Sequence, residues 1–243
     1  MKSKRVNLTI RAFDESERRF VESSHQVHAT RFTTVLGALI DIKEKEDQSI
    51  SMRYSCRMGV CGSCGMVING KPMLACQTKV MELGDSIMVE PMQGHQILRG
   101  LVSDFDEFFS KHKAVRPWII RLDAKEKFHP TKEFMQSDKQ RDMYLPFSQC
   151  IKCGLCVDAC PVSNTNKDFL GPQALAQGYR YYADSRDQGG SRRLDYLDSM
   201  DGAWGCEFAG ACSKVCPASV DPALAIQLLK SEIAKRRLLG RKD

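Results

Sequence analysis

The chain has 243 residues, of which 42% are hydrophobic and 27% are charged, and its formal net charge at pH 7 is +6. These values describe an ordinary globular protein that is long enough for two modest domains. No apolar run approaches the ~20 residues that a membrane-spanning helix needs, and the mild charge is spread along the chain, which disfavours nucleic acid as a partner.

The eleven cysteines form three groups of four, four and three. An odd total gathered into such groups is a ligand pattern rather than a disulfide framework. Free thiols in this number imply a reducing compartment.

The first hundred residues predict a small domain rich in strands. Apolar residues alternate with polar ones at the start of the chain, which indicates a half-buried strand. Thr33 or Thr34 can cap a helix whose apolar residues recur at helical spacing. Asn69 and Gly70 favour the type I′ turn of a tight hairpin. We expect strands at residues 6–12, 26–29, 51–54, 66–68, 71–74 and 86–90, and a helix at residues 35–42.

The first cysteine group lies in a glycine-rich loop. Cys56, Cys61 and Cys64 have the spacing C-x4-C-x2-C, which is typical of plant-type [2Fe–2S] sites. The predicted hairpin returns the chain to this loop and supplies Cys76 as the fourth thiolate. We therefore expect these four cysteines to hold a [2Fe–2S] cluster.

From Leu101 onward the apolar period becomes helical. The segment 121–141 is charged and aperiodic, so we expect a surface connection there. The last helix is the clearest, because Asp221 can cap it, Pro222 suits its first position and Gly240 can end it. Further helices are expected at residues 101–109, 172–183 and 192–200. The face of the last helix that we expect in the core consists of Leu224, Ile226, Leu228, Leu229 and Ile233.

The second and third cysteine groups repeat one pattern. The second is C-x2-C-x2-C-x3-C followed by Pro161, which is the run of bacterial-type iron–sulfur proteins. The third ends in the same way at Cys216 and Pro217, but it has Ala209 where the pattern has its second cysteine. The ligands of the second run are Cys150, Cys153, Cys156 and Cys160, and those of the third are Cys206, Cys212 and Cys216.

In proteins with two such runs, the cysteine before proline ligates the cluster of the other run. Cys150, Cys153 and Cys156 then combine with Cys216 in a complete [4Fe–4S] site. The other site contains only three thiolates, from Cys160, Cys206 and Cys212. Because an alanine methyl cannot ligate iron, we expect a [3Fe–4S] cluster there.

Structural zinc is the alternative reading of these cysteines, since zinc also takes four thiolates from paired C-x2-C motifs. The three evenly spaced cysteines of the second run, C-x2-C-x2-C, and the cysteine–proline endings of both runs count against zinc. Together the patterns predict an α+β protein. We expect a plant-type [2Fe–2S] domain of β-grasp-like fold at residues 1–100 and an all-helical domain of the two-cluster bacterial ferredoxin type at residues 101–243.

The chain resembles the iron–sulfur subunits of succinate dehydrogenase and fumarate reductase over nearly its whole length. The resemblance rests on the three cysteine groups in their order and on the stretches SCRMGVCGSCGMVINGKPMLAC, CIKCGLCVDACP, FLGPQALAQGYRYYADSRD, CEFAGACSKVCP and VDPALAIQ. It implies an electron-transfer subunit that passes single electrons between a flavoprotein subunit containing FAD and quinone. It also implies a peripheral position on the cytoplasmic face of the cell membrane, held by anchor subunits, and it allows haem b in the anchor. A soluble iron–sulfur carrier for another flavoprotein is the alternative function.

The quinone site departs from the pattern of many family members. They have tryptophan shortly after the residue that matches Pro161, whereas this chain has Val162-Ser163-Asn164-Thr165. Glu207 stands where some members place histidine. From the resemblance we expect only Pro161 and Lys230 to contact quinone, and a solvated position on the last helix is an equally good reading of Lys230.

Overall fold

We describe residues 3–240 of the chain from a computed structural model. Two units can be distinguished along the chain. The first runs to Asp106 and also includes Ile151–Ala159, and the second consists of Glu107–Cys150 and the residues from Cys160 onward.

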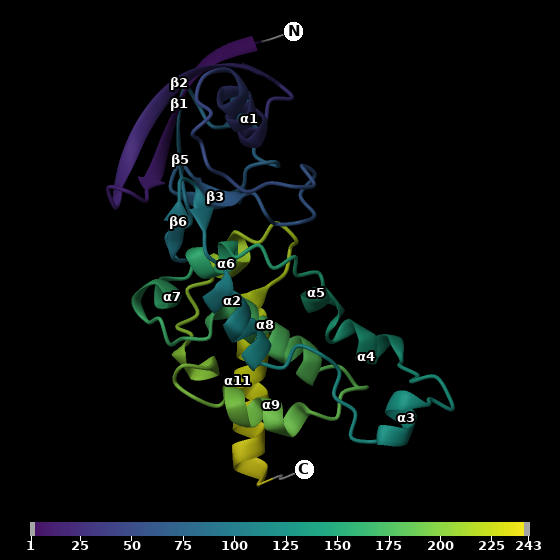
Figure 1. The fold of residues 1–243 in the computed structure, drawn as a ribbon. Helices are drawn as coiled ribbons and strands as arrows, with labels where there is room; N and C mark the ends of the chain where they lie inside the picture. The colour runs from purple at the N-terminus through teal and green to yellow at the C-terminus, as the bar shows by residue number, and fades with distance from the viewer. Residues whose placement is uncertain (1–2, 241–243) are drawn as a thin grey trace. The chain divides into compact units, whose positions relative to one another are not determined.

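The first unit is built on a five-stranded sheet in the order β2-β1-β5-β3-β4 (Figure 1). β1 pairs with β2 in antiparallel register and with β5 in parallel register. β3 forms a hairpin with β4 and a short antiparallel pairing with β5. The strands are β1 (Ser3–Asp14), β2 (Arg19–Thr30), β3 (Gly65–Ile68), β4 (Lys71–Leu74) and β5 (Ser86–Glu90). Five of the six predicted strands are therefore confirmed.

The predicted helix is α1 (Val35–Lys45), and it begins at the expected cap, because the Thr34 hydroxyl accepts a hydrogen bond from the Gly37 N–H at 3.0 Å. The strand predicted at residues 51–54 is wrong. Ser51 accepts a backbone hydrogen bond from Leu101, but residues 51–54 form no ladder with a neighbouring strand. Extended residues without such a ladder remain an irregular segment.

The predicted start of the helix at residue 101 is also wrong. Gly100, with φ of 55°, lies between two short antiparallel strands, β6 (Ile97–Arg99) and β7 (Val102–Ser103). The helix α2 (Asp106–Ala114) begins only after Asp104, whose carboxylate accepts a hydrogen bond from the Asp106 N–H at 2.8 Å. Local pairing of residues 102–103 therefore displaces the helix by five residues.

The second unit is helical. Its apolar core is formed mainly by side chains of α8 (Gly171–Tyr182), α9 (Gly190–Leu197) and α11 (Pro222–Leu239). The remaining helices are α3 (Ala124–Phe128), α4 (Asp138–Asp142), α5 (Leu145–Ser148), α7 (Pro161–Thr165) and α10 (Ala211–Lys214), while α6 (Leu155–Asp158) belongs to the first unit. Two single turns of 3₁₀-helix lie at Val80–Glu82 and Ala203–Gly205.

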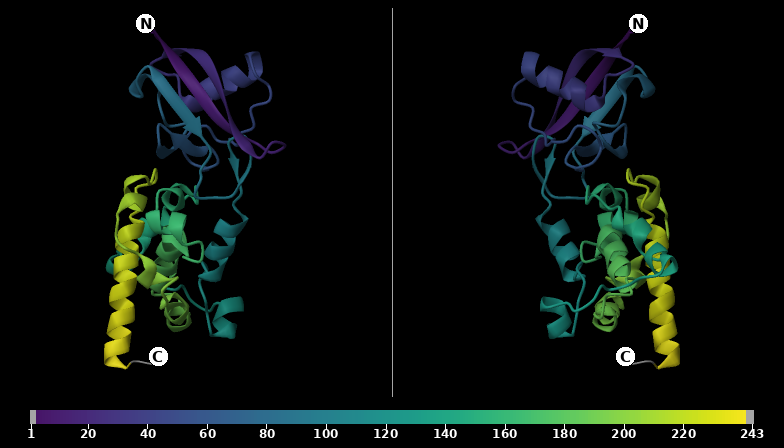
Figure 2. Two further views of the ribbon diagram at one scale, coloured as in Figure 1. Left: turned by 90° about the vertical axis from the view of Figure 1, so that its left-hand side faces the viewer. Right: turned by 90° about the vertical axis from the view of Figure 1, so that its right-hand side faces the viewer.

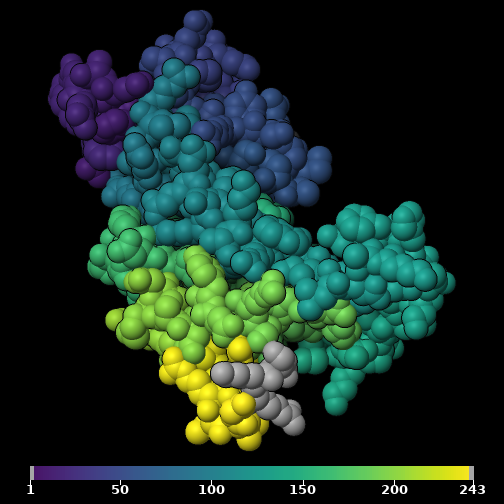
Figure 3. Space-filling model, turned by 60° about the horizontal axis from the view of Figure 1, so that its bottom comes forward, coloured from purple at the N-terminus to yellow at the C-terminus, as the bar shows by residue number. Residues whose placement is uncertain are grey.

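The last helix, α11, lies along α8 (Figure 2). Asp221 caps it by accepting a hydrogen bond from the Leu224 N–H at 2.9 Å, and Gly240 ends it with φ of 60°. Its predicted core face is correct for Ile226, Leu229 and Ile233, but the side chain of Leu224 is 47% exposed. The C-terminal turn of α11, yellow in Figure 3, reaches the surface. Within residues 3–240, no helix has both the length and the apolar character needed to cross a membrane.

Candidate iron–sulfur cluster sites

The first cysteine group forms a loop whose backbone N–H groups point at sulfur. The Sγ atom of Cys56 accepts hydrogen bonds from the N–H groups of Met58 at 3.4 Å, Val60 at 3.3 Å and Cys61 at 3.3 Å. Three donors around one sulfur stabilise a thiolate, which is the form that binds iron. The geometry at Cys56 therefore fits a cluster ligand.

The hairpin β3–β4 brings the other two ligands of this group together. Cys64 directly precedes β3 and Cys76 follows β4, and the Ala75 N–H donates to the Cys64 carbonyl at 3.0 Å. The connecting turn has φ of 49° at Asn69 and 73° at Gly70, as the type I′ prediction requires. The turn thus places Cys76 next to the loop, as expected from the sequence.

The thiols of this loop differ in acidity. A hydrogen bond from the Ser63 side chain, together with backbone hydrogen bonds, lowers the pKa of Cys61 to about 6. Burial raises the pKa of Cys64 to about 12. Cys61 is exposed and Cys64 is buried, so the loop has one thiol that ionises readily and one that ionises when a metal binds.

The second cysteine run is divided between the two units. Cys153 and Cys156 lie at α6 in the first unit, whereas Cys150 and the Cys216 predicted to join them belong to the second unit. In the first unit, Gly62 of the [2Fe–2S] loop lies directly against Cys153, because a Cβ added to Gly62 would be 2.8 Å from the Cys153 Cβ. Glycine at this position therefore lets two ligand-bearing loops touch.

The three cysteines predicted for the incomplete site do come together. Cys160, Cys206 and Cys212 line one pocket of the second unit, and Ala209 lines it with them. The rest of the lining is mainly apolar and includes Phe169. Burial raises the pKa of the Cys212 thiol. The pocket therefore presents three sulfur donors and, at Ala209, a methyl group.

The second and third runs share one backbone conformation. Lys152 and Phe208, which precede the second ligand position, have φ of 55° and 57°. Gly154 and Gly210, which follow that position, have φ of 80° and 70°, and each begins a four-residue helix, α6 or α10. Ala209 therefore occupies the backbone position that Cys153 has in the second run.

The residues expected at the quinone site lie near the third run. Pro161 is exposed and lines the same pocket as the three cysteines, and so does Glu207. Lys230 is half-buried, and its Nζ atom donates a hydrogen bond to the Cys206 carbonyl at 2.7 Å. The ammonium group is thus fixed against the cysteine loop and is not merely a solvated group on the last helix.

In residues 3–240, no three His, Cys, Asp or Glu side chains converge closely enough to hold a single metal ion. The ligands of an iron–sulfur cluster bind different iron atoms. Their sulfur atoms are therefore spaced by the width of the cluster.

The sequence reasoning missed Gln173, which lies on α8 beside Cys150. Its Nε2 atom is 3.9 Å from the Cys150 Sγ atom. It lies in the stretch FLGPQALAQGYRYYADSRD that carries the family resemblance, but no ligand motif marks it as a neighbour of a cysteine. The only signal in the sequence is an amide in the otherwise small and apolar stretch Pro172–Ala176.

Comparison with known proteins identifies the family. A model described as a 2Fe-2S iron-sulfur cluster binding domain matches residues 7–110, and one described as a 4Fe-4S dicluster domain matches residues 146–220. The chain is 46% identical over 218 residues to the fumarate reductase iron-sulfur subunit of Mycobacterium tuberculosis, which covers 88% of this chain and 87% of that protein. The chain belongs to the family of iron–sulfur subunits of succinate dehydrogenase and fumarate reductase.

Other members of the family agree. The chain is 43% identical to the fumarate reductase iron-sulfur subunit of Haemophilus influenzae, over 88% of this chain and 86% of that protein. It is 37% identical to the succinate dehydrogenase iron-sulfur subunit of Coxiella burnetii, over 88% and 89%. A chain of the Mycobacterium smegmatis Sdh1 complex in the apo form shares the fold, with a TM-score of 0.86 over 98% of both chains and 22% identity.

Family membership confirms the predicted α+β class, the [2Fe–2S] domain and the helical domain that follows it. It also decides against structural zinc, because both matching family models describe iron–sulfur domains. The chain is an electron-transfer subunit of an oxidoreductase complex.

Proposed function

We propose that this subunit carries single electrons between an FAD-containing flavoprotein subunit and membrane quinone, in a succinate:quinone or quinol:fumarate oxidoreductase. When bound, [2Fe–2S], [4Fe–4S] and [3Fe–4S] clusters would supply the one-electron chemistry. The chain would divide into the [2Fe–2S] domain at residues 1–100 and the two-cluster domain at residues 101–243. It would sit on the cytoplasmic face of the membrane, bound to the flavoprotein and to anchor subunits.

The observation that carries this proposal is the geometry of the third run. Ala209 has the backbone position of a ligand, and its methyl group lines a pocket together with three thiols. A site that offers three sulfur donors suits a cluster that lacks one iron. The ligands would be Cys160, Cys206 and Cys212 for [3Fe–4S].

The other ligand sets follow from the spacing of the cysteines. Cys56, Cys61, Cys64 and Cys76 would hold [2Fe–2S], and Cys150, Cys153, Cys156 and Cys216 would hold [4Fe–4S]. The direct approach of Gly62 to Cys153 supports electron exchange between these two sites, because it brings the ligand loops into van der Waals contact.

The chain's residues also suggest how the third site would meet quinone. Apolar residues of this pocket, among them Phe169, would surround the cluster, and the exposed Pro161 beside it would contact the quinone ring. Lys230 places a positive charge at the Cys206 carbonyl, 2.7 Å from the oxygen. A positive charge there favours the more reduced, more negative form of a nearby cluster or quinone.

Replacing Ala209 with cysteine tests the proposal. We expect Ala209→Cys to supply the missing thiolate, so that the [3Fe–4S] signal of the oxidised complex decreases in the EPR spectrum and a reduced [4Fe–4S] signal replaces it. Ala211→Cys is the matched control, since Ala211 lines the same pocket but lies outside the ligand pattern, and it should keep the [3Fe–4S] signal. A full [3Fe–4S] signal in Ala209→Cys would contradict the ligand assignment.

A further inference from the structure

Gln173 is a buried polar residue on α8 that contacts a predicted cluster ligand. Its side chain is 2% exposed. The Nε2 atom lies 3.9 Å from the Cys150 Sγ atom and 3.1 Å from the Nδ1 atom of His112. All three residues belong to the second unit. One amide nitrogen therefore faces both a thiol sulfur and an imidazole nitrogen.

The two hydrogens of the amide nitrogen suit these two neighbours. A thiolate has no hydrogen to donate, so only the nitrogen end of the amide can face Cys150 favourably. The imidazole Nδ1 atom can accept the second N–H and so hold the amide in this orientation. The Oε1 atom is buried and has no hydrogen-bond partner within the described residues. No hydrogen bond to the Oε1 atom therefore competes with the amide orientation that places the N–H group toward the sulfur.

We propose that Gln173 is a positioning residue that raises the reduction potential of the cluster bound by Cys150. This inference rests on the proposed function, in which Cys150 ligates [4Fe–4S]. An electron that arrives from the reduced [2Fe–2S] site, which is thereby reoxidised, adds one negative charge to this site, and no bond forms or breaks. An N–H group directed at a ligand sulfur stabilises the extra charge, so the reduced form gains more from Gln173 than the oxidised form.

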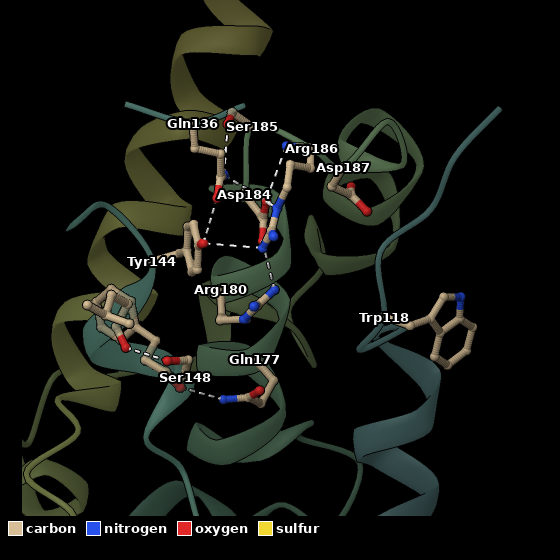
Figure 4. A network of polar contacts seen from close by, with 12 residues as sticks. Trp118, Gln136, Tyr144, Ser148, Gln177, Arg180, Asp184, Ser185, Arg186 and Asp187 are labelled. Carbon is tan, nitrogen blue, oxygen red and sulfur yellow. Dashed lines mark hydrogen bonds and ion pairs between the residues drawn. The ribbon is translucent and has the colours of Figure 1, made fainter. Parts of the chain in front are cut away.

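The neighbouring turn of α8 provides a matched control. Gln177 is also buried, but its Nε2 atom donates to the backbone carbonyl of Phe147 at 2.9 Å (Figure 4). Substituting Gln177 removes an amide of the same size from the same helix and leaves the donor to Cys150 in place. A shift that follows only the substitution of Gln173 is therefore due to the N–H at the sulfur rather than to a less polar interior.

The experiment is an EPR-monitored redox titration of the assembled complex carrying Gln173→Leu. We expect the equilibrium constant for one-electron reduction of [4Fe–4S] to fall roughly tenfold, which corresponds to a midpoint potential about 59 mV lower. The midpoints of the other two clusters should not change and serve as internal standards. Gln177→Leu should leave all three midpoints at the wild-type values.

Gln173→Met is the second variant, because an unbranched side chain of similar length fills the space without a donor. A [4Fe–4S] midpoint equal to wild type in either assembled variant would overturn the inference, as would an equal decrease in Gln177→Leu. If the wild-type complex itself shows no [4Fe–4S] signal on reduction, the proposed function fails. The two failures are therefore distinguishable.

Discussion

At the scale of single residues, Asp184 shows how this chain keeps a buried charge. Its carboxylate has no exposed surface and accepts hydrogen bonds from Arg186 at 2.8 Å and Arg180 at 3.1 Å (Figure 4). Gln136 also donates to it at 3.1 Å, and Tyr144 links Gln136 to Arg186. These contacts attach the segment before α5 to the end of α8.

The pKa of Asp184 reflects two opposing effects. Burial raises the pKa, but the hydrogen bonds from Arg186 and the charges of Arg186 and Arg180 outweigh burial, so the pKa is lower than the usual value. Because the pKa of Asp184 is lower in the folded protein than in the unfolded chain, its carboxylate contributes its full stabilisation above the unfolded pKa of about 3.9. This contribution is lost as the pH falls through the folded pKa.

We therefore expect Asp184→Asn to lower the free energy of unfolding by roughly 3 kcal/mol, or the Tm by roughly 6–12 °C. The difference in Tm from wild type should stay constant between pH 8 and pH 5 in thermal scans. Asp138→Asn is the control, because its pair with Arg141 is at the surface, with Asp138 87% exposed, and should be worth less than about 1 kcal/mol. A difference that already shrinks between pH 7 and pH 5 would contradict the lowered pKa.

At the scale of elements, Arg193 links α9 to the segment that follows α2. Arg193 of α9 is 1% exposed and forms an ion pair with Asp187 at 2.7 Å. The same guanidinium donates to the backbone carbonyls of Val115 at 3.2 Å and Arg116 at 3.1 Å. One buried side chain thus provides the hydrogen-bond donors for two backbone carbonyls just after α2.

Arg193→Leu should destabilise the helical unit by about 3–5 kcal/mol, because it leaves the buried Asp187 carboxylate without its ion-pair partner. We also expect faster tryptic cleavage at Lys113, because the backbone carbonyls of Val115 and Arg116 that follow it lose their donor. The neighbouring Arg192→Leu is the control, since Arg192 is exposed and its loss should change stability by no more than about 0.5 kcal/mol. Equal effects of the two substitutions on the Tm and on cleavage would show that the buried pair does not stabilise this region.

Elements with a local signal could be predicted from the sequence. The cap at Thr34, the Asn69-Gly70 turn and the ends of α11 each depend on neighbours within a few residues, and the structure confirms them. Residues 51–54 have no partner strand, and a short hairpin at residues 97–103 displaces the helix expected from residue 101. Apolar periodicity alone does not reveal strand pairing. The contact of Gln173 with Cys150 joins residues 23 positions apart, and no ligand motif in the sequence indicates it.

At the scale of the whole molecule, the second and third cysteine runs are two copies of one pattern. The copies have the same backbone conformation, and they differ at the second ligand position, where one has Cys153 and the other Ala209. The sequence indicates this difference, but it does not indicate that Ile151–Ala159 belongs to the first unit. That assignment depends on contacts such as the hydrogen bond from the Gly94 N–H to Asp158 at 2.6 Å.

The central claim is that this subunit contains three different clusters in series. The most direct test is EPR spectroscopy of the anaerobically purified complex, recorded once as oxidised and once after reduction with dithionite. We predict a [3Fe–4S] signal in the oxidised sample that disappears on reduction, when [2Fe–2S] and [4Fe–4S] signals appear. An oxidised sample without a [3Fe–4S] signal, together with two reduced [4Fe–4S] centres, would show that another group completes the Ala209 site and would contradict the account.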